Sequence, residues 1–194
     1  MVSICVFCGS ADALHPDYLS AARQTGRVLA ERGLRLIYGG GKTGLMGAVA
    51  DGVIESGGEV IGVIIPSMNT KTLAHIGIAR MEVVPDMHAR KARMHELADG
   101  YIALPGGFGT FDELFETLTW GQIGVHEKPV GLLNVRNYFD LLMAMILHAE
   151  KEGFVFAEHR KMICLADSPQ ELLGCMGRHE HPREAVKRWM RQDK

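Results

Sequence analysis

The sequence carries no excess of charge of either sign. Lysine and arginine together number 21, aspartate and glutamate number 23, and the formal net charge is −2. A protein that binds nucleic acid or an anionic membrane through a broad surface has a clear positive excess. We therefore expect neither nucleic acid nor a membrane as a partner, and any basic site must be local.

Long apolar runs are also absent. No apolar stretch reaches the length of about 18 residues that a membrane-spanning helix needs, and no basic region followed by an apolar run and a cleavage site opens the chain. We expect a cytoplasmic protein.

Cysteine is scarce, with four residues in the chain. Cys5 and Cys8 form a single CxxC pair, whereas a zinc site of this type needs a second pair. Because Cys5 lies inside an apolar run and Cys8 at its end, we interpret both as buried thiols. Such thiols are compatible with a reducing compartment.

Glycine is abundant: 23 of 194 residues, or about 12% against a usual value of about 7%. Several glycines cluster just after apolar runs, in Cys8-Gly9-Ser10, in residues 39–41 and in residues 106–109. Clustered glycine indicates tight turns and close approach of the backbone to a ligand.

Apolar runs alternate with segments of helical spacing along the chain. The expected strands cover residues 2–7, 34–38, 60–65, 81–84, 101–104, 130–133 and 162–165. The expected helices cover residues 17–32, 44–55, 87–98, 110–123, 138–151 and 168–176, with a polar, helical or frayed tail from residue 178 onward. Residues 67–80 show no clear period and are expected to form a loop or short helix near the site.

This alternation predicts an α/β fold: a Rossmann-like, doubly wound parallel sheet of about seven strands with helices on both faces. We expect residues 1–194 to form a single nucleotide-binding domain. Ligands of such sheets bind at the carboxyl ends of the strands, at a topological switch point. The three glycine turns should therefore meet in one composite nucleotide pocket.

The segment PGGFGTFDE, residues 105–113, is the most informative part of the chain. Its glycines follow a predicted strand, Thr110 can cap the helix that follows, and Asp112 and Glu113 are expected in the first helical turn. Backbone N–H groups at a helix start form a cradle for an anion. A carboxylate beside that cradle favours chemistry on a phosphorylated molecule. The alternative is an ordinary N-cap followed by acids that stabilise the helix start.

Two common nucleotide motifs are disfavoured. Gly39, Gly41 and Gly44 match GxGxxG, but the next strand ends in Ile64-Ile65-Pro66 without the acid that binds ribose in NAD enzymes. A P-loop ending at Lys42 would need glycine at position 36, which is leucine.

The run Met87–Met94 carries Arg90, Lys91 and Arg93 at the start of a predicted helix. Positive charge opposes the helix dipole there, and an anionic ligand would offset that cost. The alternative is a solvated helix face.

The remaining candidates are interpreted as structural. His88 and His95 lack a third ligand at metal spacing, so we predict no metal site. We interpret the polar segment 179–181 as solvated surface. We interpret the apolar helix residues Trp120, Ile123 and 143–147 as core or subunit interface.

The assembled motifs resemble those of the Lonely Guy family, the cytokinin riboside 5′-monophosphate phosphoribohydrolases once described as possible lysine decarboxylases. The matching stretches are residues 7–10, 38–51, 57–66, 86–94, 104–116 and 119–135. Nothing in the chain marks the lysine of a pyridoxal-phosphate enzyme, so lysine decarboxylation is disfavoured.

The resemblance implies hydrolysis of the N-glycosidic bond of an adenine-type nucleoside 5′-monophosphate, giving free base and ribose 5-phosphate. It implies no cofactor and at least a homodimer. On the family motif the catalytic pair is Arg90 and Glu113, and the phosphate loop is Gly106, Gly107, Gly109 and Thr110. From the other glycine turns and the basic run we add Gly9, Ser10, Gly40, Gly41, Met87 and Lys91 as substrate-binding residues.

The chemistry is consistent with these residues. Cleavage of a ribosyl bond builds oxocarbenium-like charge, which the carboxylate of Glu113 can stabilise while it holds ribose hydroxyls or orients water. Arg90 is always protonated and is expected to position the ligand rather than act as an acid. A non-catalytic nucleotide or cofactor carrier and a nucleoside transferase with a carboxylate nucleophile remain open.

The chain departs mildly from the family pattern at two places, of which the second leaves contacts to the edge of the substrate open. Asp112 stands where glutamate is common, and residues 67–80 match poorly. The sequence as a whole leaves the base open between prenylated adenine, plain adenine and another base.

Overall fold

The computed structural model describes residues 1–191, which form one parallel sheet of seven strands in the order β4-β3-β2-β1-β5-β6-β7. The strands are β1 (Ser3–Phe7), β2 (Arg35–Tyr38), β3 (Val60–Ile64), β4 (Arg80–Val83), β5 (Gly100–Ala103), β6 (Val130–Leu133) and β7 (Ile163–Ala166). The predicted α/β class and doubly wound parallel sheet are confirmed.

Helices connect all consecutive strands except β3 and β4, which are joined by a loop. They are α1 (Pro16–Glu31), α2 (Gly44–Glu55), α3 (Met87–Leu97), α4 (Phe108–Gln122), α5 (Asp140–Lys151), α6 (Ala157–Arg160), α7 (Pro169–Met176), α8 (Arg183–Trp189) and the 3₁₀ turn η1 (Val135–Asn137). The sequence analysis did not anticipate η1 or α6. The tail is helical in α8, and its last residues, 192–194, lie outside the described residues.

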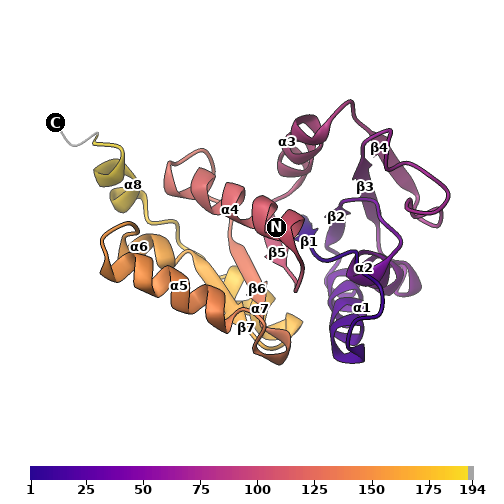
Figure 1. Cartoon of the computed structure of the whole chain (residues 1–194), viewed down its shortest axis with the longest axis horizontal. Coiled ribbons are helices and arrows are strands. Elements are labelled where there is room, and N and C mark those ends of the chain that lie inside the picture. Colours follow the sequence, from indigo (N-terminus) through magenta and orange to yellow (C-terminus); the bar gives the residue numbers. More distant parts are fainter. Residues whose placement is uncertain (192–194) are drawn as a thin grey trace.

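The two faces of the sheet are covered by different helices (Figure 1). Helices α1, α2 and α7 pack on one face, where their apolar side chains join those of the strands in one core cluster. Helices α3, α4 and α5 pack on the other face in a second cluster that includes Met94 and Leu114. The central strands β1, β3, β5 and β6 are buried along their whole length, as their near-continuous apolar sequences require.

Strand β1 lies between β2 and β5, and Cys5 pairs with Ile37 on one side and with Tyr101 on the other. The chain proceeds from β1 towards β4 in one direction and from β5 towards β7 in the other. The gap between the carboxyl ends of β1 and β5 is therefore the topological switch point.

Some of the glycine excess serves helix packing rather than ligand binding. A Cβ on Gly26 of α1 would lie 2.1 Å from the carbonyl oxygen of Val49, and one on Gly52 of α2 would lie 2.1 Å from that of Arg23. Only glycine allows α1 and α2 to approach this closely.

Helix α4 begins earlier than expected. Gly107 is its N-cap and Phe108 its first residue, so Thr110 lies inside the first turn and Asp112 and Glu113 in the second. The prediction of Thr110 as the cap was wrong. Its buried hydroxyl faces the turn before the helix, where a Cβ on Gly106 would lie 2.1 Å from it.

Residues 67–79 form turns that are attached to the second glycine turn. Lys42 N–H donates to the carbonyl of Leu73 at 2.9 Å, and His75 N–H donates to that of Gly40 at 2.9 Å. The loop expected in this segment is confirmed, and it is held over the carboxyl end of β2.

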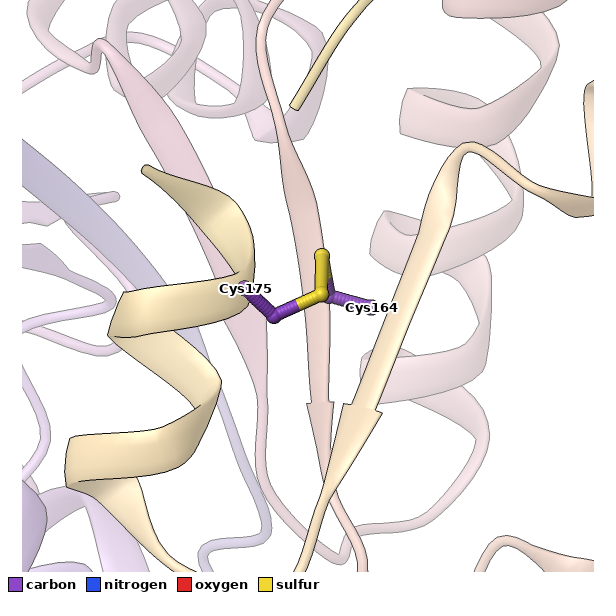
Figure 2. Close-up of a disulfide and its surroundings, with 2 residues drawn as sticks. All are labelled: Cys164 and Cys175. Atoms are coloured by element: carbon purple, nitrogen blue, oxygen red, sulfur yellow. A yellow bond between two sulfur atoms is a disulfide. The ribbon is translucent and has the colours of Figure 1, made fainter. Parts of the chain in front are cut away.

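The cysteines fall into two groups. Cys5 and Cys8 are free and buried, as predicted. Figure 2 shows that Cys164 on β7 and Cys175 on α7 form a disulfide, which the sequence analysis did not anticipate.

His179 and His181 are half-buried rather than solvated, with ring centroids 6.1 Å apart. The prediction of a solvated surface was wrong for these two histidines; the helix that follows them, α8, also packs on the protein through its buried Ala185. Within residues 1–191 no helix is both long and apolar enough to cross a membrane.

Candidate active site

A cavity of about 540 Å³ opens at the carboxyl ends of β1, β2 and β5, at the switch point. All three glycine turns contribute to its wall. The predicted site residues that line it are Gly9, Ser10, Gly41, Met87, Arg90, Gly106, Gly107, Gly109, Thr110 and Glu113. Gly40 and Lys91 are not among the lining residues.

The glycine turns are bonded to one another. Gly9 N–H donates to the carbonyl of Pro105 at 3.0 Å, and the Gly9 carbonyl accepts from the N–H of Leu45 at 2.9 Å. The hydroxyl of Thr43 donates to the carbonyl of Ser10 at 2.8 Å. The wall of the cavity is therefore one connected backbone structure rather than three independent loops.

Arg90 reaches the cavity from α3 with 5% of its surface exposed. Its Nε donates to the carbonyl of Val63 at 3.0 Å and its Nη2 to that of Gly39 at 3.3 Å. A Cβ on Gly39 would lie 1.9 Å from Nη2, so the glycine makes room for the guanidinium. Two carbonyls at the ends of β2 and β3 thus fix the plane of the arginine.

Glu113 enters from α4 and is 6% exposed. Its Oε1 lies 3.7 Å from Nη1 of Arg90. Burial raises the pKa of Glu113 to about 7, although the positive charge of Arg90 opposes the rise. Near neutral pH the carboxyl group therefore exchanges between its acid and its carboxylate form.

Lys91 points elsewhere than predicted. Its Nζ lies 3.1 Å from Asp112 and 3.0 Å from Glu116, so two carboxylates of α4 already neutralise it. Sequence reasoning missed these partners because they belong to a different helix.

Gly40 supports the turn rather than the cavity. It has φ +75°, and a Cβ there would lie 2.8 Å from the sulfur of Met81. Both the left-handed backbone and the packing require glycine at this position.

The basic run is not a solvated face. Arg90 is buried, and Arg93 pairs with Glu82 at 2.7 Å and with Glu96 at 2.9 Å. Asp86 caps the helix by accepting from the N–H of Ala89 at 2.8 Å, which offsets the charge at this end.

Several lining residues were not predicted as site residues, because apolar and aromatic side chains are also what a core contains. They are Leu14, Tyr18, Met46, Ile64, Met68, Leu73, Phe108 and Tyr138. Their side chains give the cavity apolar and aromatic surface of the kind that a flat aromatic ligand can contact.

Within residues 1–191 no cluster of three histidine, cysteine or carboxylate side chains has the geometry to hold a metal ion. His95 is buried on α3, and its Nδ1 lies 2.8 Å from the hydroxyl of Tyr101, a partner in the core.

Comparison with known proteins agrees with this geometry. Residues 46–176 match the family model described as possible lysine decarboxylase. The chain is 45% identical over 177 residues to cytokinin riboside 5′-monophosphate phosphoribohydrolase LOG7 of Arabidopsis thaliana, covering 91% of this chain and 82% of that protein. It is also 45% identical over 170 residues to the LOG phosphoribohydrolase of rice, Oryza sativa subsp. japonica, covering 88% and 70%.

The chain belongs to the Lonely Guy family. The resemblance inferred from its motifs is thereby confirmed over most of its length.

The same fold occurs in solved structures of proteins that are not described as phosphoribohydrolases. A molybdenum cofactor binding protein from Rippkaea orientalis has a TM-score of 0.68 at 27% identity, covering 90% of this chain and 94% of that one. The molybdenum cofactor carrier protein of Chlamydomonas reinhardtii has a TM-score of 0.66 at 21% identity, covering 97% and 98%, and shows the fold alone.

Proposed function

We propose that this protein hydrolyses the N-glycosidic bond of adenine-type nucleoside 5′-monophosphates and releases free base and ribose 5-phosphate. The observation that carries the proposal is the buried pair of Arg90 and Glu113 in a cavity whose wall includes the N-terminus of α4. The names of relatives at about 45% identity support the same reaction.

The phosphate would bind at the start of α4. The first helical hydrogen bond there runs from the N–H of Phe111 to the carbonyl of Gly107. The preceding N–H groups of Gly107, Phe108, Gly109 and Thr110 belong to the orphan donors of a helix start, at its positive end. All four residues line the cavity.

Glu113 would act at the ribose. Its carboxylate form stabilises the positive charge that develops on the sugar as the glycosidic bond breaks, and it can also orient the attacking water. The two hydrogen bonds that Arg90 donates to backbone carbonyls favour a positioning role. The base would lie against the apolar and aromatic residues that line the cavity. We assign no particular substituent to its N6.

A cofactor carrier is the second candidate, because one solved structure of the same fold is that of a molybdenum cofactor binding protein. Incubation with AMP, or with N6-substituted AMP, in excess chelator separates the two. Hydrolysis predicts ribose 5-phosphate together with adenine from AMP, or with the N6-substituted adenine from N6-substituted AMP, whereas a carrier returns intact nucleotide. Exchange of an added acceptor base would instead indicate a transferase.

The 5′-phosphate should be essential. Charge-assisted hydrogen bonds contribute roughly 1.5–3 kcal/mol each, so losing two lowers kcat/KM about a hundredfold or more. Equal rates on AMP and adenosine, well below saturation, would contradict the assignment of the glycine loop.

We also propose that residues 1–194 act as one domain and that the protein assembles at least as a homodimer. Large apolar side chains are exposed at Leu141, Met145 and Phe154, on or just after α5. Light scattering at micromolar concentration tests the dimer, and a clean species of 21.3 kDa would contradict it.

A cytoplasmic location is part of the same proposal. Disulfides are rare in that compartment, so Cys164 and Cys175 should be recovered there as thiols. Alkylation of freshly lysed cells tests this expectation.

A further inference from the structure

The hydroxyl of Tyr138 donates a hydrogen bond to the carbonyl oxygen of Gly106, the first glycine of the loop before α4. The ring also lines the cavity. Tyr138 lies beyond β6, directly after η1, so the contact joins two segments that are distant in sequence.

This bond fixes one peptide plane. In a trans peptide the C=O and the following N–H point in opposite directions, so holding the Gly106 carbonyl also holds the N–H of Gly107, the N-cap of α4. Glycine on both sides leaves this peptide otherwise free to rotate. A single side-chain hydroxyl therefore limits the motion of a donor that lines the cavity.

The two residues that precede Tyr138 have an unfavourable backbone conformation. Arg136 and Asn137 both have left-handed conformations, with φ of 53° and 59°. Non-glycine residues seldom adopt this region, and strained backbone persists where surrounding contacts determine it.

Contacts of this kind surround η1. Nη1 of Arg136 lies 2.9 Å from Asp17 of α1, and the N–H of the buried Phe139 donates to Asn134 at 2.9 Å. The ring of Tyr138 packs edge-on against Tyr18, with centroids 6.1 Å apart.

We propose that Tyr138 is a positioning residue that pre-orients the Gly106–Gly107 peptide for the 5′-phosphate. The idea rests on the proposed function only in taking that phosphate as the ligand of the loop. Loss of the hydroxyl should weaken binding of the phosphate and leave contacts to the base and ribose unchanged.

The test compares Tyr138→Phe with its parent, both carrying Glu113→Gln so that the nucleotide stays intact. Calorimetric titration with AMP and with adenosine gives two dissociation constants. A neutral hydrogen bond contributes enough to change affinity roughly threefold to tenfold, so we expect AMP to bind that much more weakly and adenosine to bind as before.

Tyr101→Phe is the matched control, since its hydroxyl bonds to His95 away from the cavity. It should leave the ratio of AMP to adenosine affinity unchanged even if it lowers the melting temperature. In proteins that keep Glu113, Tyr138→Phe should have a higher KM for AMP than wild type, while its kcat changes less than about twofold. Destabilisation of the fold alone would not raise KM and spare kcat in this way.

The outcomes separate the two proposals. If the protein fails to hydrolyse AMP but Tyr138→Phe still lowers its preference for AMP over adenosine, the positioning role stands and the catalytic proposal fails. An unchanged preference in Tyr138→Phe overturns the positioning role, and so does a parent that binds AMP no better than adenosine.

Discussion

Nη1 of Arg90 lies 3.7 Å from Oε1 of Glu113, and both side chains are buried at the topological switch point of the sheet. The arginine comes from the face of the sheet covered by α3, and the glutamate from the second turn of α4. An unpaired carboxylate in such a place would be costly, so the arginine stabilises the charged form that the proposed chemistry uses.

The raised pKa of Glu113 predicts a pH dependence of turnover. The carboxylate is the active form, so kcat/KM for AMP should rise with pH through about 7 and level off above it. The phosphate of AMP itself titrates near pH 6, so the residual activity of Glu113→Gln over the same range serves as the control. A wild-type profile that is flat between pH 5 and 9 would contradict this role.

The same shift has a consequence for stability. The folded pKa of Glu113 lies above the unfolded value of about 4.3, so its stabilising contribution is complete below that value and is lost as pH rises through about 7. Urea unfolding should therefore show that Glu113→Gln gains stability relative to wild type between pH 4 and pH 8. A difference that stays constant across this range would argue against a buried, titrating Glu113.

Substitution of Arg90 tests its positioning role. Arg90→Ala removes the donors to Val63 and Gly39 and the partner of Glu113, and should lower kcat/KM at least about a hundredfold. Arg90→Lys keeps the charge but cannot reproduce the planar fork, so it should recover only part of the loss. Arg93→Ala, on the same helix but paired with Glu82 outside the cavity, is the control and should retain activity.

The disulfide should affect stability without affecting catalysis. Cys164 and Cys175 are 11 residues apart, and closing a loop of this size stabilises a fold by about 3 kcal/mol. Cys164→Ala/Cys175→Ala should unfold at lower urea, with kcat/KM unchanged because neither residue lines the cavity. In purified protein that has been oxidised so that the pair is a disulfide, reductant should lower the wild-type midpoint in the same way and leave the variant unaffected. A midpoint of the oxidised wild type that does not respond would contradict the prediction.

The sequence predicted the parts of the structure that depend on local pattern. Alternating apolar runs defined the strands. The first helix was predicted to end at residue 32, and α1 has its C-cap there: the next residue, Gly33, has φ +65°, and the N–H of Leu34 closes the helix on Leu29. The glycine turns were predicted at one edge of the sheet because each follows a strand, and the carboxyl ends of parallel strands all lie at the same edge.

What the sequence could not predict depends on tertiary contacts. The start of α4 was predicted too late, because threonine is a common N-cap residue. In the structure the hydroxyl of Thr110 instead packs against the turn at Gly106. Lys91 was assigned to the substrate because its partners, Asp112 and Glu116, are on another helix. Tyr138 had no motif, and only the fold brings it to the loop.

The most direct test of the account compares wild type with Glu113→Gln in two measurements on AMP: binding by calorimetry and release of adenine by chromatography. The amide keeps the size of the side chain but cannot carry negative charge. Glu116→Gln, one turn further along α4 and outside the cavity, is the control and should retain turnover. We predict that Glu113→Gln binds AMP within a few-fold of wild type and loses roughly 10²-fold or more of its turnover. Near-normal release of adenine by Glu113→Gln would show that turnover does not need the negative charge of Glu113.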